Sequence, residues 1–191
     1  MSNQNPRQTR KPKQPAGEQR GPTPGTLIDG ARMYAAAADA VNEKFPNALH
    51  VISHLLGMSI ELALKAYLRK SSCSLGRLKE LGHDLLKLFV AAEEYGFERT
   101  GSRRYVLAVL NGLYKPRAFA YPEPAMLSTI VPWRLRQMAE ELIEICFIKV
   151  HGKRKFEKLK KEPGLCIGSE YAADLDASAW AQKQLVLGGG K

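Results

Sequence analysis

The sequence predicts an all-α protein, an up-and-down bundle of four to five helices with a disordered basic N-terminal tail. Apolar residues recur at helical spacing in five separate segments, and no segment has the strict alternation of a strand. The 191 residues are 45% hydrophobic and 25% charged, as in an ordinary globular domain. We expect a tail over 1–25, a helical bundle domain over 26–151 and a basic, partly disordered C-terminal extension over 152–191.

The N-terminal tail is rich in Gln, Pro, Gly, Lys and Arg and has almost no apolar residues. Such a segment cannot offset its ordering entropy by burial, so we expect it to be disordered. Its positive charge suits either a solubilising tail or an arm that binds nucleic acid. Because residues 1–20 are polar throughout, the tail does not have the pattern of a secretory signal.

The five predicted helices cover residues 26–43, 46–70, 84–95, 102–113 and 129–150. The first has an apolar stripe that includes Ala31 and Ala38. Pro46 either ends this helix or lies in the first turn of the second. Asp84 is expected at the positive N-terminal end of the third helix, and Gly96 stops that helix. The fourth helix has core candidates from Tyr105 to Leu113. A proline-bearing loop separates it from the fifth helix.

The second helix carries a narrow polar stripe opposite a broad apolar face, made of His50, His54, Glu61 and Lys65. This stripe could be solvated, face an interface or line a polar pocket for a ligand or a second subunit. The i, i+4 spacing of His50 and His54 also suits a metal ion, but no third ligand is evident in the sequence. We therefore expect no metal and no cofactor.

Cysteine usage and hydropathy indicate where the chain works. The three cysteines, Cys73, Cys146 and Cys166, are far apart and form no CxxC pair, which fits a reducing compartment and a cytoplasmic protein. No stretch reaches about 18 consecutive apolar residues, so we expect no membrane span. The net charge of +10 favours polyanionic partners and is concentrated in the tail and in residues 149–161.

Two motifs and their order resemble HEPN-like domains. The second helix contains Ser59-Ile-Glu-Leu-Ala-Leu-Lys-Ala-Tyr-Leu, and Gly82-His-Asp-Leu-Leu-Lys-Leu follows; then come a helix ending in Tyr114 and an Arg117…Tyr121-Pro122 loop. The resemblance covers about residues 28–150. It implies a helical bundle that dimerises, associates with RNA or nucleotides and accompanies a nucleotidyltransferase in prokaryotic defence or toxin–antitoxin systems.

The resemblance also implies where catalysis would lie. Catalytic HEPN-like proteins are metal-independent ribonucleases with an Arg and a His separated by four to six residues, a spacing that Arg77 and His83 meet. An imidazole can move the 2′-hydroxyl proton while a guanidinium holds the phosphate. The alternative is that His83 begins a helix and Arg77 is a solvated side chain.

Two further groups could contact nucleic acid. Lys115, Arg117 and Tyr121, with Phe119, combine cations and aromatic rings on one loop, which suits phosphate contact and base stacking. The run of cations from residue 149 to 161 could follow a nucleic-acid backbone; it includes Lys153, Arg154 and Lys155. The alternatives are a loop packed on the bundle by its aromatic rings and a solvated helix end.

Three functions are consistent with these features. The first is a dimeric RNA- or nucleotide-associated accessory protein, the second is a metal-independent endoribonuclease, and the third is a non-catalytic protein–protein interaction module. Salt-sensitive RNA binding separates the first from the third, and RNA cleavage in EDTA would identify the second.

Overall fold

The computed structural model describes residues 21–114 and 132–161, and within them it is entirely α-helical. The helices are α1 (Pro24–Lys44), α2 (Leu49–Lys70), α3 (Leu75–Leu81), α4 (Leu85–Glu94), α5 (Gly101–Tyr114), α6 (Pro132–His151) and α7 (Lys153–Leu159). The predicted all-α bundle is confirmed. The tail over 1–20 and the segments 115–131 and 162–191 lie outside the described residues, among them the predicted nucleic-acid residues Lys115, Arg117 and Tyr121.

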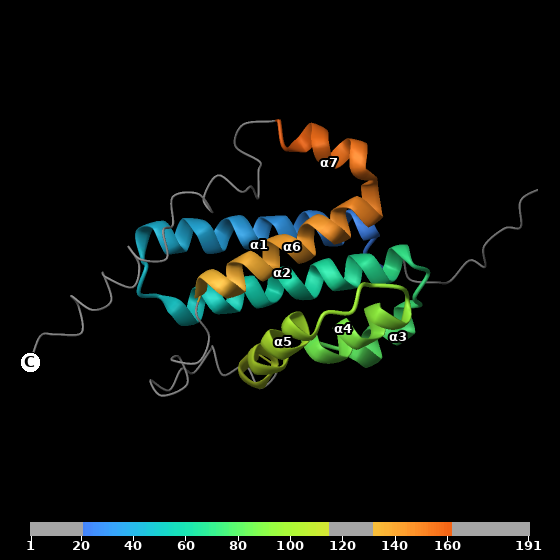
Figure 1. Cartoon of the computed structure of the whole chain (residues 1–191), viewed down its shortest axis with the longest axis horizontal. Helices are drawn as coiled ribbons and strands as arrows, with labels where there is room; N and C mark the ends of the chain where they lie inside the picture. Colours follow the sequence, from blue (N-terminus) through green and yellow to red (C-terminus); the bar gives the residue numbers. More distant parts are fainter. Residues whose placement is uncertain (1–20, 115–131, 162–191) are drawn as a thin grey trace, which may run out of the picture.

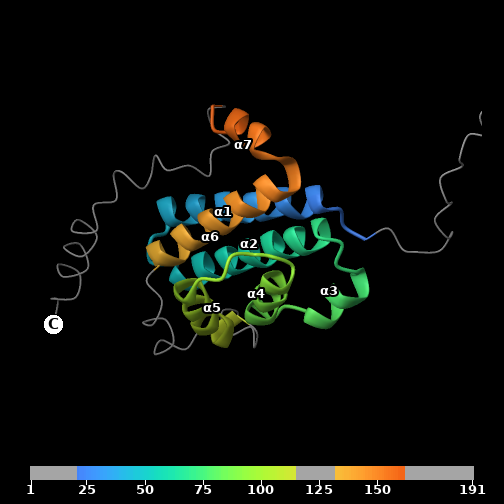
Figure 2. The ribbon, with the colours of Figure 1, turned by 45° about the vertical axis from the view of Figure 1, so that its right-hand side comes forward.

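Helix α2 is the centre of the bundle, as Figures 1 and 2 show. It contacts α1 and α6 on one side and α4 and α5 on the other. Its buried Ser59 hydroxyl donates a hydrogen bond to the Ala31 carbonyl oxygen of α1 at 2.8 Å, so this motif residue joins the first two helices. The core is built from large apolar side chains without solvent exposure, including Ile28, Leu56, Ile60, Leu64, Leu68, Leu88, Phe89, Leu107, Leu110, Leu135 and Phe147.

The high apolar content of α2 reflects its central position. By length and hydropathy it is the one described helix that could cross a membrane, but 67% of the apolar window is buried inside the protein. A helix covered on several sides by other helices has this composition for the same reason as a membrane span, because little of its surface meets water.

Helix boundaries differ from the predictions where short-range signals are weak. Helix α2 begins at Leu49, not near Pro46, because residues 46 and 47 form a turn after α1. Helix α1 begins at Pro24, inside the predicted tail, and the Thr23 hydroxyl accepts a hydrogen bond from the Thr26 amide at 3.1 Å. Tyr105 was expected in the core but is 73% exposed. The buried face of α5 lies instead along Leu107, Leu110 and Tyr114.

Helices α3 and α7, which have seven residues each, are not among the predicted helices. Both are too short to show helical periodicity and are fixed by a few specific contacts. The Ser74 hydroxyl caps α3 by accepting from the Arg77 amide. Phe156 has polar neighbours in the sequence but is buried in the structure. Its ring attaches α7 to Phe147 of α6, and the two ring centroids are 5.9 Å apart.

Candidate functional site

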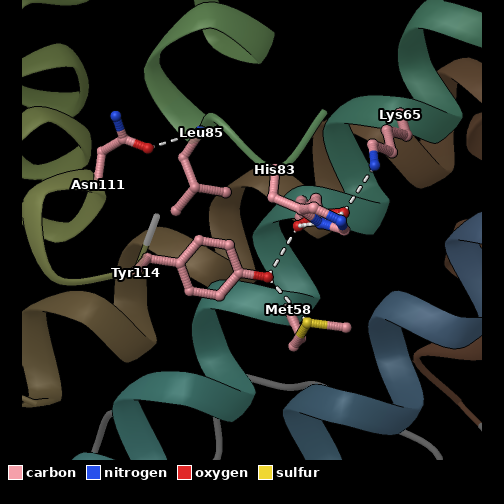
Figure 3. A network of polar contacts seen from close by, with 7 residues as sticks. Met58, Lys65, His83, Leu85, Asn111 and Tyr114 are labelled. Carbon is pink, nitrogen blue, oxygen red and sulfur yellow. Dashed lines mark hydrogen bonds and ion pairs between the residues drawn. The ribbon is translucent and has the colours of Figure 1, made fainter. Parts of the chain in front are cut away.

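The carboxylate of Glu61 lies at the centre of the polar contacts between α2, α4 and α5. The Glu61 residue is 2% exposed. The Lys65 amine donates to Oε1 at 2.7 Å and the Tyr114 hydroxyl donates to Oε2 at 2.8 Å. The His83 Nδ1 lies 3.0 Å from both oxygens. Figure 3 shows the side chains of His83, Lys65 and Tyr114 pointing toward one another.

The Gly-His-Asp sequence gives His83 its position. Gly82 ends α3 with a φ of +60°, a conformation that favours glycine. Asp84 lies at the expected N-terminal end of α4 and caps it by accepting from the Lys87 amide at 3.1 Å. The Asn111 side chain of α5 accepts from the Leu85 amide at 2.9 Å and donates to Asp84 at 3.0 Å. His83 is thus held between two fixed backbone positions and can reach across to α2.

Tyr114 closes the site from the α5 side. Its ring lies so close to Gly57 that a Cβ atom there would be 2.7 Å from the ring. Burial, followed by the negative charge of Glu61 and the hydrogen bond to it, raises the pKa of the Tyr114 hydroxyl well above its ordinary value. The hydroxyl therefore keeps its proton and remains a donor to the carboxylate.

The exposure of the three donors differs, and this difference determines what the site can do. The His83 side chain is 68% exposed, whereas that of Lys65 is 16% exposed and Tyr114 is buried. When Nδ1 carries the proton toward Glu61, Nε2 is left as an unprotonated acceptor. A buried carboxylate that orients an accessible imidazole is the arrangement used in general-base catalysis. The less exposed Lys65 and Tyr114 each donate a hydrogen bond to the Glu61 carboxylate, and the positive charge of Lys65 offsets its negative charge.

One residue of the predicted polar stripe, Glu61, therefore lies at the interface of α2 with α5 and with the turn before α4. Glu61 and Lys65 pair with each other, and Glu61 also contacts Tyr114 of α5 and His83 of the turn before α4. His54 is exposed, with its ring centroid 5.8 Å from that of Tyr114, and His50 is partly exposed at the start of the helix. Among residues 21–114 and 132–161, no group of three His, Cys, Asp or Glu side chains could hold a metal ion.

The structure does not join the predicted catalytic pair. Arg77 Nη1 contacts Glu80 at 3.1 Å on the surface of α3, where both side chains are at least half exposed. His83 instead contacts Glu61, a residue of the predicted polar stripe that its position in the sequence does not connect to His83. The signal that could have linked them is the pairing of the two motifs: a glutamate between apolar residues of a predicted core helix needs hydrogen-bond donors, and the Gly-His-Asp segment supplies one through the His83 imidazole.

The predicted cations of the C-terminal region lie on a separate surface. Lys153, Arg154 and Lys155 are exposed on α7, and Lys149 is exposed near the end of α6. The Lys160 amine lies 4.5 Å from the centroid of the Phe156 ring, so the same aromatic residue that attaches α7 also packs against a cation. In Figures 1 and 2, α7 lies on the opposite side of the bundle from α3 and α4, and hence from His83.

Comparison of the chain with family models, curated proteins and solved structures finds no match. Conclusions about function therefore depend on the residues and contacts described above.

His151, at the end of α6, makes stability sensitive to pH. Burial, followed by the nearby positive charge of Lys155, lowers its pKa below the ordinary value of 6.5. The unfolded chain then binds a proton more readily than the folded one, so the unfolding free energy falls as pH drops through 6.5 toward the folded-state pKa.

We expect His151→Gln to weaken this acid sensitivity. The unfolding free energies of the wild-type protein and the variant are measured by chemical denaturation at several pH values below 6.5. Subtracting one from the other removes the contribution of the other histidines. Parallel stability curves for the two proteins would contradict the expectation.

Proposed function

We propose that this protein is a cytoplasmic, HEPN-like, RNA-associated accessory protein that binds the RNA backbone through the cationic surface of α7. The observation that carries the proposal is the exposure of Lys153, Arg154 and Lys155 on a helix that Phe156 fixes to the bundle. Cations held on a folded surface release counterions when they contact successive phosphates, which gives sequence-independent affinity. The net charge of +10 acts in the same direction.

A homodimer and a nucleotidyltransferase partner belong to the same proposal, through the resemblance of the second helix and the Gly-His-Asp segment to HEPN-like domains. Large apolar side chains that would suit a protein contact remain exposed on several helices, with Met33 at 74% and Tyr105 at 73%. Such side chains also suit the third function, a pure interaction module. RNA binding separates these two functions because a module without a nucleic-acid role has no need of it.

The triple substitution Lys153→Gln, Arg154→Gln and Lys155→Gln should weaken binding to a single-stranded RNA about tenfold or more at low salt, because up to three phosphate contacts are lost. Fluorescence anisotropy with a labelled oligonucleotide measures the change. The matched control is Lys79→Gln, Lys87→Gln and Arg99→Gln, which removes equal charge from exposed positions around α3 and α4. Equal affinities of the two triple variants would mean that net charge alone, and not this surface, attracts the RNA.

A second function, metal-independent RNA cleavage, is favoured by one specific contact, the pairing of exposed His83 with the buried Glu61 carboxylate. The imidazole Nε2 would take the proton of a 2′-hydroxyl, whose oxygen attacks the adjacent phosphorus. The 5′-oxygen then leaves with a proton from the imidazolium, giving a 2′,3′-cyclic phosphate.

For this second function we expect RNA cleavage in EDTA to fall by about two or more orders of magnitude in His83→Ala. Gel analysis of RNA products measures it, with Arg77→Ala as a companion variant. If RNA cleavage survives in His83→Ala, His83 is not the catalytic base. If cleavage is lost in Arg77→Ala, Arg77 acts with His83 in catalysis, as the sequence predicts.

A further inference from the structure

The side of α1 that faces away from the bundle is apolar over its middle turns. Helix α1 packs on α2 and α6 (Figures 1 and 2) through buried residues that include Ile28, Ala31, Ala35 and Ala38. On the opposite side, the exposed side chains between Asp29 and Glu43 are those of Met33, Ala36, Ala37 and Ala40. Met33 is 74% exposed. A helix side that meets water normally carries charged or polar residues, so this surface is unusual for a solvated one.

We define the outward face of α1 as Asp29, Met33, Ala36, Ala37, Ala40 and Lys44. At about 100° per residue, these six positions lie within about 100° of arc around the helix axis and extend about 22 Å along it. The two ends of the face carry opposite charges. The Asp29 side chain is 61% exposed, and Lys44 is exposed in the last turn of the helix. The face therefore has an apolar centre between an acidic end and a basic end.

The outward face is complementary to a second copy of itself in the antiparallel orientation. A twofold axis between positions 36 and 37 places Met33 of one copy opposite Ala40 of the other, so the large side chain meets a small one. The same register places Asp29 opposite Lys44 at both ends, so each acidic group meets a basic one. Alanine at the centre lets the two helix axes approach to about 8 Å.

We propose that two copies of this chain dimerise by packing their outward faces of α1 antiparallel about this twofold axis. A symmetric contact needs both members of each complementary pair on one face of one chain, and the outward face supplies them. The inference rests on the homodimer of the proposed function and names its contact surface. One helix pair buries little area, so the dimer should be weak, and salt should weaken it further by screening the Asp29–Lys44 pairs.

Sedimentation equilibrium of the full chain, over protein concentrations up to about 1 mM, measures the dissociation constant of this weak dimer. Ala37→Glu places two like charges beside the twofold axis and should weaken the dimer about tenfold or more. The matched control is Ala108→Glu, at an exposed position of α5, which should leave the dissociation constant unchanged. Glutamate suits an exposed helix position, so both variants should keep the helix content of the wild type by circular dichroism.

Charge reversal tests the antiparallel register without relying on Ala37→Glu. Asp29→Lys alone and Lys44→Glu alone each place like charges opposite one another, so each should weaken the dimer several-fold at low salt. The double variant Asp29→Lys/Lys44→Glu keeps the net charge of the wild type and again pairs opposite charges. It should therefore dimerise like the wild type. Weakening by the single reversals that the double variant does not repair would overturn the proposal.

RNA binding, measured by fluorescence anisotropy, distinguishes failure of this interface from failure of the proposed function. If Ala37→Glu dimerises as well as the wild type, the α1 interface is wrong, whether or not RNA binds. If the wild type stays monomeric at the highest concentration, the interface and the proposed homodimer both fail, and RNA binding decides RNA association separately. If the wild type dimerises through α1 but does not bind RNA, the interface stands and RNA association fails.

Discussion

Glu61→Ala should destabilise the protein by about 3–5 kcal/mol, because removing one partner of a buried ion pair leaves the remaining groups uncompensated. Lys65 and Tyr114 would lose their acceptor in a region where water has little access, and His83 would lose the contact that orients it. The unfolding free energy from urea denaturation measures the effect.

The matched control for Glu61 is Glu80, which also pairs with a cation on its own helix. Both side chains of the Glu80–Arg77 pair are exposed, so Glu80→Ala should lower the free energy of unfolding by less than about 1 kcal/mol. Glu61→Gln tests charge separately from shape, since the amide retains one acceptor oxygen for the three donors. If Glu61→Ala and Glu80→Ala were equally mild, the carboxylate would not be the centre of the interface between α2, α4 and α5.

Gly57→Ala should destabilise the protein by about 1–3 kcal/mol, the usual range for overpacking a well-packed interior. The new Cβ atom would lie 2.7 Å from the Tyr114 ring, so the ring must move. The Tyr114 hydroxyl is 2.8 Å from Glu61, and a shift of the ring weakens that hydrogen bond. The better helix propensity of alanine opposes only part of this loss, about 1 kcal/mol.

Gly112→Ala is the control for Gly57. Gly112 also lies inside a helix, but nothing is within 4 Å of its Cβ position. Alanine there should stabilise the protein by about 0.5–1 kcal/mol through helix propensity alone. Thermal or chemical unfolding of the two variants should therefore give changes of opposite sign. A stabilising Gly57→Ala would show that Tyr114 does not pack against α2 as described.

The sequence predicted the long helices well because each has an apolar stripe that spans several turns. Short helices lack this signal, and α7 depends on a single buried aromatic residue, Phe156. The predicted stripe contained Glu61 and Lys65, and the catalytic prediction contained His83, but the contact between them depends on how α4 lies against α2. Sequence spacing cannot supply that geometry, because residue 61 lies in α2 and residue 83 lies in the turn between α3 and α4.

The most direct test of the proposed function is the salt dependence of RNA binding by the wild-type protein. The logarithm of the association constant is measured against the logarithm of KCl concentration with a single-stranded oligonucleotide. Contacts from α7 to three or more phosphates predict a linear decrease with a slope of about −2 or steeper, since each phosphate neutralised contributes roughly −0.7. Absence of binding at low salt, or a slope near zero, would contradict RNA association through this surface.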